Sequence, residues 1–382
     1  MKNLTQRYKK ITGVIFIVLG ILALITPLTP GSWLIFVGLE LIGIRLVFYK
    51  NLQKTIMKLV TKLNIQKKTM INIQKNIILA PYTTFRIGGP AKEFVEVTSE
   101  RELIEAVDYA EKNNLKIFIL GGGSNLLISD NGFDGLVIKI KLNNLEIDNE
   151  KNTIIAGAGV SIAKLIKYAT EHSLTGLEWS AGLPGGLGGA IRGNAGTFGL
   201  SMYDVVVSVR IYNLENKKIE EFEKNKCELV YRNSIFKKNE NLIILSAILK
   251  LEKGEKDAIQ QKVLENINWR KNTFPENSSP GSFFRHTEPT EHNLKKLQEL
   301  PRFYELKMHE KNTIPTGFVI EEAGLKGKKI GGAMVSQKHA NFILNTGDAT
   351  AEDVVMLASF IKQQVRDQFG VELQEEIRYV GF

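Results

Sequence analysis

A glycine-rich stretch near the middle of the chain constrains the fold more than any other feature. It runs from Ser180 to Gly199 and contains eight glycines. Because each glycine costs about 0.5–1 kcal/mol relative to alanine inside a helix or strand, this density predicts a loop whose bare amides lie against another surface. Such amides can bind phosphate groups or pack on a flat ring. A disordered linker is the alternative, but apolar residues recur along the stretch like buried anchors: Leu183, Leu187, Ile191 and Phe198.

The chain has 382 residues and a formal net charge of +9, and the positive charge is concentrated at the N-terminal end. Residues 1–70 contain eleven Lys and Arg residues and one acidic residue, Glu40, whereas the rest contains 39 basic and 40 acidic residues. A nucleic-acid-binding protein would carry its basic patch on the folded body, so we expect no nucleic-acid partner. A basic terminus favours contact with an anionic membrane surface.

Two apolar segments within residues 1–70 predict a two-helix transmembrane hairpin. Residues 11–28 are uncharged, and residues 33–49 form a second apolar run. The turn between them, Pro30-Gly31-Ser32-Trp33, resembles the Pro-Gly-Pro-Gly-Trp tip of a small bacterial membrane family. Both segments have basic flanks, so we expect both ends on the cytoplasmic side. A secretory signal peptide is the alternative, although a second span follows and no small-x-small cleavage site does.

A lysine-rich segment follows the hairpin. Its lysines recur at every fourth position opposite an apolar face, which predicts a basic amphipathic helix lying on the bilayer. These lysines are Lys50, Lys54, Lys58 and Lys62. A solvated lysine face over an ordinary packed stripe is the alternative. Residues 64–76 indicate a linker, so we assign residues 1–70 to the membrane region and expect the globular body to begin near Ile77.

The body mixes helices and strands without regular βαβ alternation, which predicts an α+β fold. Residues that alternate or cluster as apolar runs predict strands over Glu93–Val97, Lys116–Leu120, Leu136–Ile140, Thr153–Ala156, Val205–Tyr212, Leu242–Leu251 and Ile377–Val380. Helical periodicity predicts helices over Ser99–Asn113, Ser161–His172, Asp257–Asn272 and Thr350–Phe369, the first of them capped by Ser99.

Cysteine and histidine usage bounds the chemistry. Cys227 is the only cysteine, which excludes an internal disulfide and a cysteine-based zinc site. A reducing, cytoplasmic location of the body follows. The five histidines show no spacing typical of metal ligands, so we expect no metal.

Three glycine clusters recur on the body: Thr84–Pro90, Leu120–Asn125 and Gly182–Gly199. None matches a nucleotide fingerprint, because a P-loop needs a lysine and a Rossmann turn needs a strand–helix frame. A strand that ends in Gly121-Gly122-Gly123-Ser124-Asn125 nevertheless presents several amides that suit a pyrophosphate. Together the clusters indicate a dinucleotide with two phosphates and a large planar ring.

Seven motifs follow one another in the order seen in the UDP-N-acetylenolpyruvoylglucosamine reductase (MurB) family, which the chain resembles from Ile77 to Phe382. They are Thr83-Thr84-Phe85-Arg86-Ile87-Gly88-Gly89, Gly121-Gly122-Gly123-Ser124-Asn125, Gly182-Leu183-Pro184-Gly185-Gly186, Asn194-Ala195-Gly196, Tyr231-Arg232-Asn233-Ser234, Gly281-Ser282-Phe283-Phe284 and Glu376-Ile377-Arg378. The resemblance implies an FAD-binding domain of the vanillyl-alcohol oxidase type over residues 77–253. It also implies a C-terminal α+β substrate-binding domain over residues 254–382.

The resemblance also implies the reaction. NADPH would reduce FAD, and the flavin would pass hydride to the enolpyruvyl group of UDP-N-acetylglucosamine enolpyruvate, giving UDP-N-acetylmuramate. Arg232 would hold the substrate carboxylate, Ser282 would donate the proton and Glu376 would assist at the enol stage. The implied FAD-binding residues are Arg86, Gly121, Gly122, Gly123, Ser124, Asn125, Gly182, Pro184, Gly185, Gly186, Asn194 and Gly196. The structural alternatives are that Ser282 caps a strand end, that Arg232 forms a surface ion pair and that Glu376 is a partner for Arg378.

The chain departs from parts of the family pattern. Lys237–Phe274 is too short for the tyrosine-bearing loop of some members, so the chain resembles the subtype without it. Thr273 stands where some members carry a lysine, and Thr287–Thr316 is an unassigned insertion. Neither glycine loop offers a His or Cys for attachment, which indicates non-covalent FAD. His339 either lines the site or is structural.

The sequence therefore favours a flavoenzyme of peptidoglycan precursor synthesis, tethered to the cytoplasmic face of the plasma membrane. Its partners would be the enolpyruvyl sugar nucleotide, NADPH and the membrane. Two alternatives stay open. One is an FAD oxidoreductase of the same fold acting on another sugar or alcohol, and the other is a membrane-tethered, non-catalytic scaffold.

Overall fold

The computed structural model describes Thr12, residues 71–305 and residues 313–382. The chain divides into two compact units, Met1–Met70 and Ile71–Phe382, and only the second is described as a fold. The transmembrane hairpin and the basic amphipathic helix predicted within residues 1–70 lie outside the described residues. In the part of the chain that the structure describes, no helix is long and apolar enough to cross a membrane.

A four-stranded sheet opens the second unit. Its strands, in spatial order, are β1 (Gln74–Ile78), β2 (Pro90–Val97), β5 (Phe133–Ile140) and β3 (Lys116–Leu120). Strand β1 is antiparallel to β2, whereas β5 is parallel to both of its neighbours. Strand β1 begins at Gln74 and pairs with β2, so the folded body starts before Ile77, where the sequence predicted it. The last residues of the linker predicted over 64–76 therefore belong to β1.

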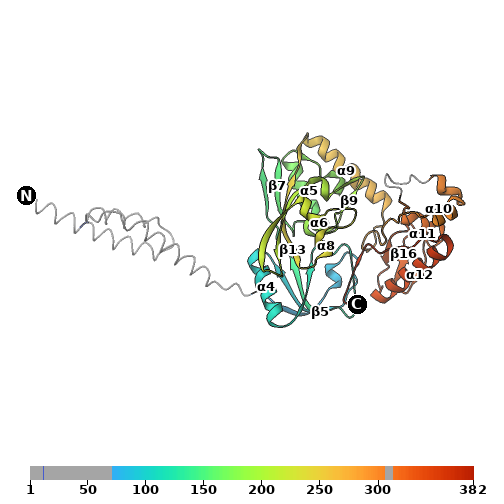
Figure 1. Ribbon diagram of the computed structural model, residues 1–382, viewed down its shortest axis with the longest axis horizontal. Coiled ribbons are helices and arrows are strands. Elements are labelled where there is room, and N and C mark those ends of the chain that lie inside the picture. Colours follow the sequence, from blue (N-terminus) through green and yellow to red (C-terminus); the bar gives the residue numbers. More distant parts are fainter. Residues whose placement is uncertain (1–11, 13–70, 306–312) are drawn as a thin grey trace, which may run out of the picture. The chain divides into compact units, whose positions relative to one another are not determined.

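Helix α4 (Glu100–Lys112) connects β2 to β3 and packs on one face of this sheet (Figure 1). It begins where the sequence predicted, because the Ser99 hydroxyl accepts a hydrogen bond of 3.2 Å from the Glu102 amide. Leu103 and Val107 of the helix are fully buried in one core cluster with Leu136 of β5. The opposite face of the sheet forms a smaller core around Phe94, Phe118, Leu120 and Val137.

A five-stranded antiparallel sheet lies beside the first one. Its strands, in spatial order, are β12 (Lys218–Glu223), β11 (Val206–Asn213), β13 (Leu242–Lys250), β7 (Thr153–Gly157) and β6 (Leu145–Asp148). Helix α5 (Ile162–Glu171) follows β7 and is capped by Ser161, whose hydroxyl accepts from the Lys164 amide. The main core cluster contains residues of both sheets and of α4 and α5, which makes the two sheets one packed body.

The glycine-rich stretch contains a helix, which the density of glycines had argued against. Helix α6 spans Leu187–Arg192. A Cβ added to Gly188 would lie 2.9 Å from the Ala158 Cβ, so glycine allows this helix to pack closely on the chain after β7. Leu187 and Ile191 are fully buried as predicted, but Phe198 is 49% exposed. Its ring lies against Trp269 of α9 instead, with ring centroids 4.8 Å apart.

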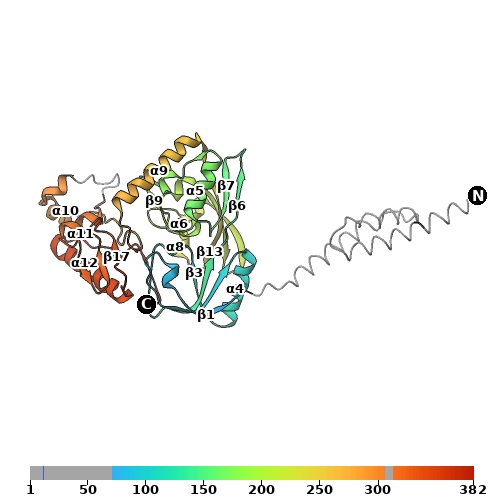
Figure 2. The same cartoon turned by 180° about the vertical axis from the view of Figure 1, so that it is seen from behind.

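The C-terminal third forms a smaller helical group with its own core. Helix α9 (Lys256–Thr273) leads into it, and the group gathers to one side of the two sheets, beyond α9 (Figures 1 and 2). It comprises α10 (Glu291–Gln298), α11 (Thr316–Glu322), β15 (Lys329–Ile330), β16 (Ala333–Val335), β17 (Ile343–Asn345) and α12 (Ala351–Phe369). Helix α12 is capped at its start by Thr350, the residue at which the sequence predicted the helix to begin, and at its end by Gly370 in the left-handed region at φ 69°.

The insertion at 287–316, unassigned from sequence, holds α10 and a 3₁₀ turn over Pro301–Glu305, while residues 306–312 lie outside the described part. Short elements fill the connections. They are β4 (Leu126–Ile128), β8 (Leu174–Thr175), β9 (Gly196–Thr197), β10 (Leu200–Ser201), α7 (Met202–Val205), α8 (Ile235–Lys238), β14 (Glu252–Lys253) and the 3₁₀ turns Ala80–Tyr82, Glu178–Ser180 and Lys224–Cys227.

The last strand, β18 (Arg378–Val380), returns to the first half of the unit and runs parallel to β4. Strand β4 follows the Gly121–Asn125 loop directly. This return places the segment before β18, with Glu376, at the edge of the glycine loops.

Candidate functional site

Two of the glycine clusters touch each other. The first loop, 121–125, follows β3, and the second, 182–186, precedes α6. A Cβ on Gly122 would lie 2.3 Å from the Gly185 Cα, and a Cβ on Gly185 would lie 2.7 Å from the Ser124 hydroxyl oxygen. Real side chains do not approach backbone that closely, so glycine at these positions is what allows the two loops to meet.

The third cluster closes the same region from the other side. The Thr84 amide donates to the Gly123 carbonyl at 3.0 Å. Gly123 has a φ of 71°, and a Cβ there would lie 2.0 Å from the Tyr82 carbonyl oxygen. Arg86 is the exception among the residues predicted here, because its exposed guanidinium donates to the Pro81 carbonyl at 3.1 Å.

Most amides of the two touching loops have no acceptor in the described part of the chain, although the Leu183 amide donates to the Ser180 carbonyl. Among residues 71–305 and 313–382, no acceptor takes a hydrogen bond from the amides of Gly122, Gly123, Ser124 and Asn125. Within these described ranges, the Gly185 and Gly186 amides also have no acceptor. Pro184, which precedes them, carries no N–H. Two adjoining loops with several unpaired amides offer a set of donors that fits a diphosphate. The residues present therefore fit the pyrophosphate of a dinucleotide such as FAD.

Two asparagines connect these loops to the rest of the site. The Asn125 side-chain amide donates to the Glu376 carbonyl at 3.1 Å, and the Arg378 amide donates to the Asn125 carbonyl at 3.0 Å. The Asn194 side-chain amide donates to the Val230 carbonyl at 2.9 Å and its oxygen accepts from the Tyr203 amide at 3.0 Å. Asn194 thus supports the turn after Val230, while Gly196 pairs with Ser201 between β9 and β10.

Arg232 lies at the tip of a tight turn. Val230 and Asn233 exchange two backbone hydrogen bonds of 3.1 Å, which leaves Tyr231 and Arg232 as the two central residues. Arg232 has a φ of 52°, a left-handed conformation that favours glycine at this turn position. Strain of this kind persists only where the surrounding structure enforces it, and it concentrates at functional sites.

The structure brings Arg232 and Glu376 together. The Arg232 Nε lies 2.8 Å from the Glu376 Oε1, and their side chains are 25% and 17% exposed. The Nε–H is not directed at the oxygen, so the contact is an ion pair and not a hydrogen bond. Burial raises the pKa of Glu376, although Arg232, Lys237 and Arg285 act in the opposite direction. The site therefore favours a Glu376 carboxyl that holds a proton more readily than an ordinary glutamate.

Ser282 lies beside Glu376. The Phe283 carbonyl accepts a hydrogen bond of 2.8 Å from the Glu376 amide, and the Phe283 amide donates to the Asn341 carbonyl at 2.8 Å. Gly281, at φ 86°, turns the chain immediately before the serine. No hydrogen-bond partner of the Ser282 hydroxyl is found among the described residues, so the hydroxyl is available to a ligand.

Several cations around this pair were missed by the sequence analysis. The Lys237 ammonium donates to the Arg232 carbonyl at 3.1 Å, and burial lowers the pKa of Lys237, with repulsion from Arg285 adding to the effect. The Arg285 Nε is buried without an acceptor in the described part of the chain. Arg192 and Arg378 share Glu240. Burial, followed by repulsion from Arg378, lowers the pKa of Arg192 to about 10.

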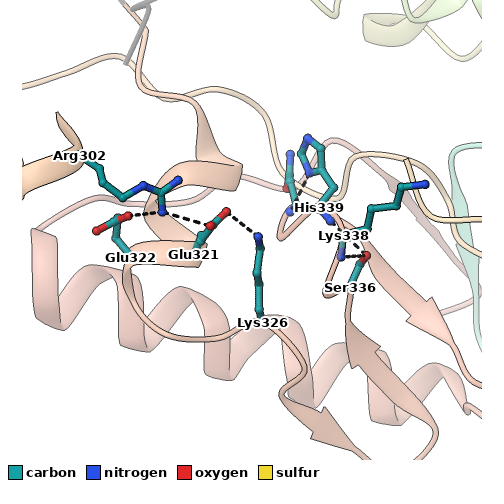
Figure 3. A network of polar contacts seen from close by, with 8 residues as sticks. Arg302, Glu321, Glu322, Lys326, Ser336, Lys338 and His339 are labelled. Atoms are coloured by element: carbon teal, nitrogen blue, oxygen red, sulfur yellow. Dashed lines mark hydrogen bonds and ion pairs between the residues drawn. The ribbon is translucent and has the colours of Figure 1, made fainter. Parts of the chain in front are cut away.

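His339 belongs to a structural loop beside this region. Its Nδ1 accepts from the Asn341 amide at 3.2 Å, and its own amide donates to the Ser336 hydroxyl at 3.2 Å (Figure 3). Burial lowers the pKa of His339, which favours the neutral ring that this acceptor role needs. Asn341 in turn bonds to Phe284 through both ends of its side-chain amide. His339 thus supports the segment after Ser282.

Figure 3 also shows Glu321 between Arg302 and Lys326, in a separate ion-pair group.

Comparisons with known proteins agree with this arrangement. A family described as "FAD binding domain" matches residues 91–222, and one described as "UDP-N-acetylenolpyruvoylglucosamine reductase, C-terminal domain" matches residues 274–380. The UDP-N-acetylenolpyruvoylglucosamine reductase of Caldanaerobacter subterraneus subsp. tengcongensis is 40% identical over 302 residues, covering 78% of this chain and 91% of that protein. That of Bacillus velezensis is 36% identical over 307 residues, covering 79% and 92%. The solved reductase (MurB) from Thermus caldophilus is 28% identical with a TM-score of 0.65, covering 81% of this chain and 100% of that one.

Proposed function

The chain belongs to the UDP-N-acetylenolpyruvoylglucosamine reductase family, and from this membership we infer that it reduces UDP-N-acetylglucosamine enolpyruvate to UDP-N-acetylmuramate. It is an oxidoreductase that uses FAD, with NADPH as co-substrate, and its product is a peptidoglycan precursor. One observation supports this function above the others. Two touching glycine loops with free amides lie directly beside the Arg232–Glu376 pair.

We propose that the loops 121–125 and 182–186 hold the FAD pyrophosphate through their free amides. When bound, FAD takes hydride from NADPH and delivers it to the substrate. Neither loop contains a His or Cys, so the attachment is non-covalent. Arg86 is not assigned a direct contact, because its guanidinium is exposed and bonds to Pro81. Asn194 acts by supporting the Tyr231–Arg232 turn.

We assign Arg232, Ser282 and Glu376 to the substrate's enolpyruvyl group. Addition of hydride to its C3 leaves negative charge on C2 and the carboxylate, and a proton must then reach C2. The guanidinium of Arg232 binds the carboxylate through its terminal N–H groups, with geometry that a lysine cannot supply. The free Ser282 hydroxyl donates the proton to C2. Glu376, whose burial raises its pKa, shares a proton with the developing enol.

The surrounding cations suit this substrate. It carries a carboxylate and a diphosphate, and the site offers Arg232, Lys237 and Arg285 within one half-buried region. Lys237 also holds the carbonyl of Arg232, so it positions the turn as well as contributing charge. We propose these cations as the replacement for the lysine absent at Thr273.

We propose that the FAD-binding domain, predicted over 77–253, extends back to β1 at Gln74 and that residues 254–382 form the substrate-binding part. We also propose that residues 1–70 form a hairpin that tethers the enzyme to the cytoplasmic face of the membrane. The family matches at 91–222 and 274–380 fall on either side of residue 254. The tether rests on the apolar runs and basic flanks of residues 1–70. The full chain is expected to pellet with membranes, whereas a protein starting at Ile71 should stay in solution and keep full activity. Loss of activity in that shortened protein, with FAD still bound, would contradict the tether.

The decisive experiment measures NADPH oxidation with and without UDP-N-acetylglucosamine enolpyruvate. We expect turnover that depends on this sugar nucleotide and yields UDP-N-acetylmuramate. Turnover with another sugar or alcohol in its place would indicate a different oxidoreductase of the same fold. A protein that binds FAD but consumes no NADPH with any of these substrates would be a non-catalytic scaffold.

A further inference from the structure

Lys139 contacts the start of the first glycine loop, 121–125. It is on β5, paired with Leu120 of β3, and its ammonium donates a hydrogen bond to the carbonyl of Gly121. The same ammonium lies 5.9 Å from the centre of the Tyr82 ring. Gly121 is the first residue of the loop, so this bond joins the body of the sheet to the loop's entry point.

The ammonium of Lys139 makes no ion pair in the part of the chain that the structure describes. Among residues 71–305 and 313–382, no ion pair or hydrogen bond connects Lys139 to an acidic side chain. The neighbouring Lys141 differs, because its ammonium lies 3.6 Å from Glu96 and its side chain is 42% exposed. Burial lowers the pKa of Lys139 and repulsion from Lys141 adds to the effect, whereas Glu96 on the neighbouring strand acts in the opposite direction. A half-buried cation that makes no ion pair is costly, so it needs a reason beyond packing.

Peptide geometry supplies that reason. In a trans peptide the C=O of one residue and the N–H of the next point in opposite directions, and none of the described peptides is cis. Because Lys139 holds the Gly121 C=O toward the sheet, the Gly122 N–H points away from it. That N–H is among those with no acceptor in the described part of the protein. Without Lys139, the glycine pair would be free to rotate this peptide, since glycine has few steric restrictions.

We propose that Lys139 is a positioning residue for the cofactor. It fixes the Gly121–Gly122 peptide so that the Gly122 amide faces the FAD pyrophosphate, and its unpaired charge attracts the two phosphates. The inference rests on the proposed FAD function of the two loops. It extends that function to a side chain that belongs to none of the seven motifs.

The test compares two lysines of one strand. Lys139→Met and Lys141→Met are purified with the wild type as holoproteins, their non-covalent flavin is removed, and the dissociation constants of added FAD and riboflavin are measured by flavin fluorescence. Riboflavin has the same ring but no phosphate. We expect Lys139→Met to weaken FAD binding at least about tenfold, as loss of a charge-assisted interaction does, and riboflavin binding less than about twofold. Lys141→Met should leave both constants unchanged.

The outcomes separate this inference from the function on which it rests. A wild-type protein that binds no FAD would overturn the proposed function itself. A wild type that binds FAD together with an unaltered Lys139→Met would overturn the role of Lys139 alone. Equal weakening of FAD and riboflavin would mean that Lys139 serves only folding. If the methionine variant yields no folded protein, Lys139→Gln, which keeps a neutral donor, enters the same comparison and must lose affinity for FAD selectively.

Discussion

The loops that we propose to hold the cofactor and the charged cluster around Arg232 differ in the chemical groups that they offer to a ligand. We propose both as sites for anions, yet the loops 121–125 and 182–186 offer backbone amides and no charged side chain. The Arg232 cluster offers several cations and one carboxyl whose pKa is raised by burial. The loops depend on close backbone contact, so they tolerate no added atom at Gly122 or Gly185. The cluster depends on the charges of its side chains and on how those side chains are oriented.

The two regions are therefore expected to be sensitive to different kinds of change. A site built from backbone is lost when its geometry changes, and it responds little to pH or salt. A site built from side-chain charges should lose activity in graded steps as single groups are altered. Substitutions in the loops are therefore expected to remove the cofactor, whereas substitutions in the cluster should slow one half of the reaction.

The largest effect is expected for Gly122→Ala. The added Cβ would lie 2.3 Å from the Gly185 Cα, so the loops must separate and FAD binding should be abolished. The flavin absorbance of the purified protein measures this. Gly193→Ala is the control, because its Cβ would meet nothing nearer than the Gly189 carbonyl at 3.6 Å and its flavin content should be normal. A yellow Gly122→Ala protein would show that the loops do not form the cofactor site.

Ser282→Ala should slow one half-reaction strongly and spare the other. We expect normal FAD content and a near-normal rate of flavin reduction by NADPH. Reoxidation by the enolpyruvyl sugar nucleotide should slow by about 10²–10⁴-fold, the usual contribution of a positioned acid. Stopped-flow absorbance of the flavin resolves the two halves. Reoxidation within a few-fold of the wild-type rate would mean that another group donates the proton.

Arg232→Lys keeps the positive charge and loses the bidentate fork. Reoxidation by the sugar nucleotide is expected to slow about 10–100-fold, as for a lost hydrogen bond to a charged group, with flavin reduction by NADPH little changed. Arg210→Lys is the matched control, since Arg210 makes a bidentate pair with Glu100 at 3.0 Å on the surface of β11. Equal losses in both half-reactions would assign Arg232 to folding or flavin binding instead.

Two adjacent lysines differ in their surroundings, and only one of them contacts the Arg232 turn. Lys237 donates to the Arg232 carbonyl at 3.1 Å, whereas Lys238 is exposed and lies 2.6 Å from Glu228. We expect Lys237→Met to raise the KM for the sugar nucleotide by about tenfold, because the strained Arg232 turn loses its support. Lys238→Met should have the wild-type KM and kcat. Identical kinetics of the two variants would remove Lys237 from the site.

The smallest effect concerns pH. Burial raises the pKa of Glu376 above its ordinary value of 4.5, so the folded state binds this proton more tightly than the unfolded state does. The resulting stabilisation is complete below about pH 4.5 and is lost as the pH rises through the raised folded pKa. Glu376→Gln should therefore gain stability relative to the wild type as the pH rises above 4.5. Urea unfolding of both proteins at several pH values tests the sign, and a constant difference would contradict it.

Much of the fold could be predicted because its long elements carry their own signals. Helices α4, α5, α9 and α12 and the strands β3, β7, β11 and β13 lie within about two residues of their predicted bounds, since caps and apolar periodicity are local in the chain. The short strands β15, β16 and β17 were missed. Segments of two or three residues have no period to read, and they form only because the C-terminal core pairs them.

The glycine-rich stretch shows where local inference ends. Its glycines suggested a loop, but α6 forms within it because Gly188 packs on Ala158, a contact that sequence spacing does not reveal. Phe198, expected inside, is half exposed for the same reason, since its neighbours in space come from α9.

The family, the long elements and the order of the glycine and charge-bearing motifs could be inferred from the sequence, because these depend on residue types at short spacing. Only the tertiary structure decided that Gly122 meets Gly185, that Arg232 pairs with Glu376, and that Lys237, not Lys238, lies inside. The first two contacts join segments that are far apart in the chain. The third sets apart two adjacent lysines, which are the same residue type in the sequence. Packing selects them, because burial and the free energy of close contact depend on what surrounds a residue in space.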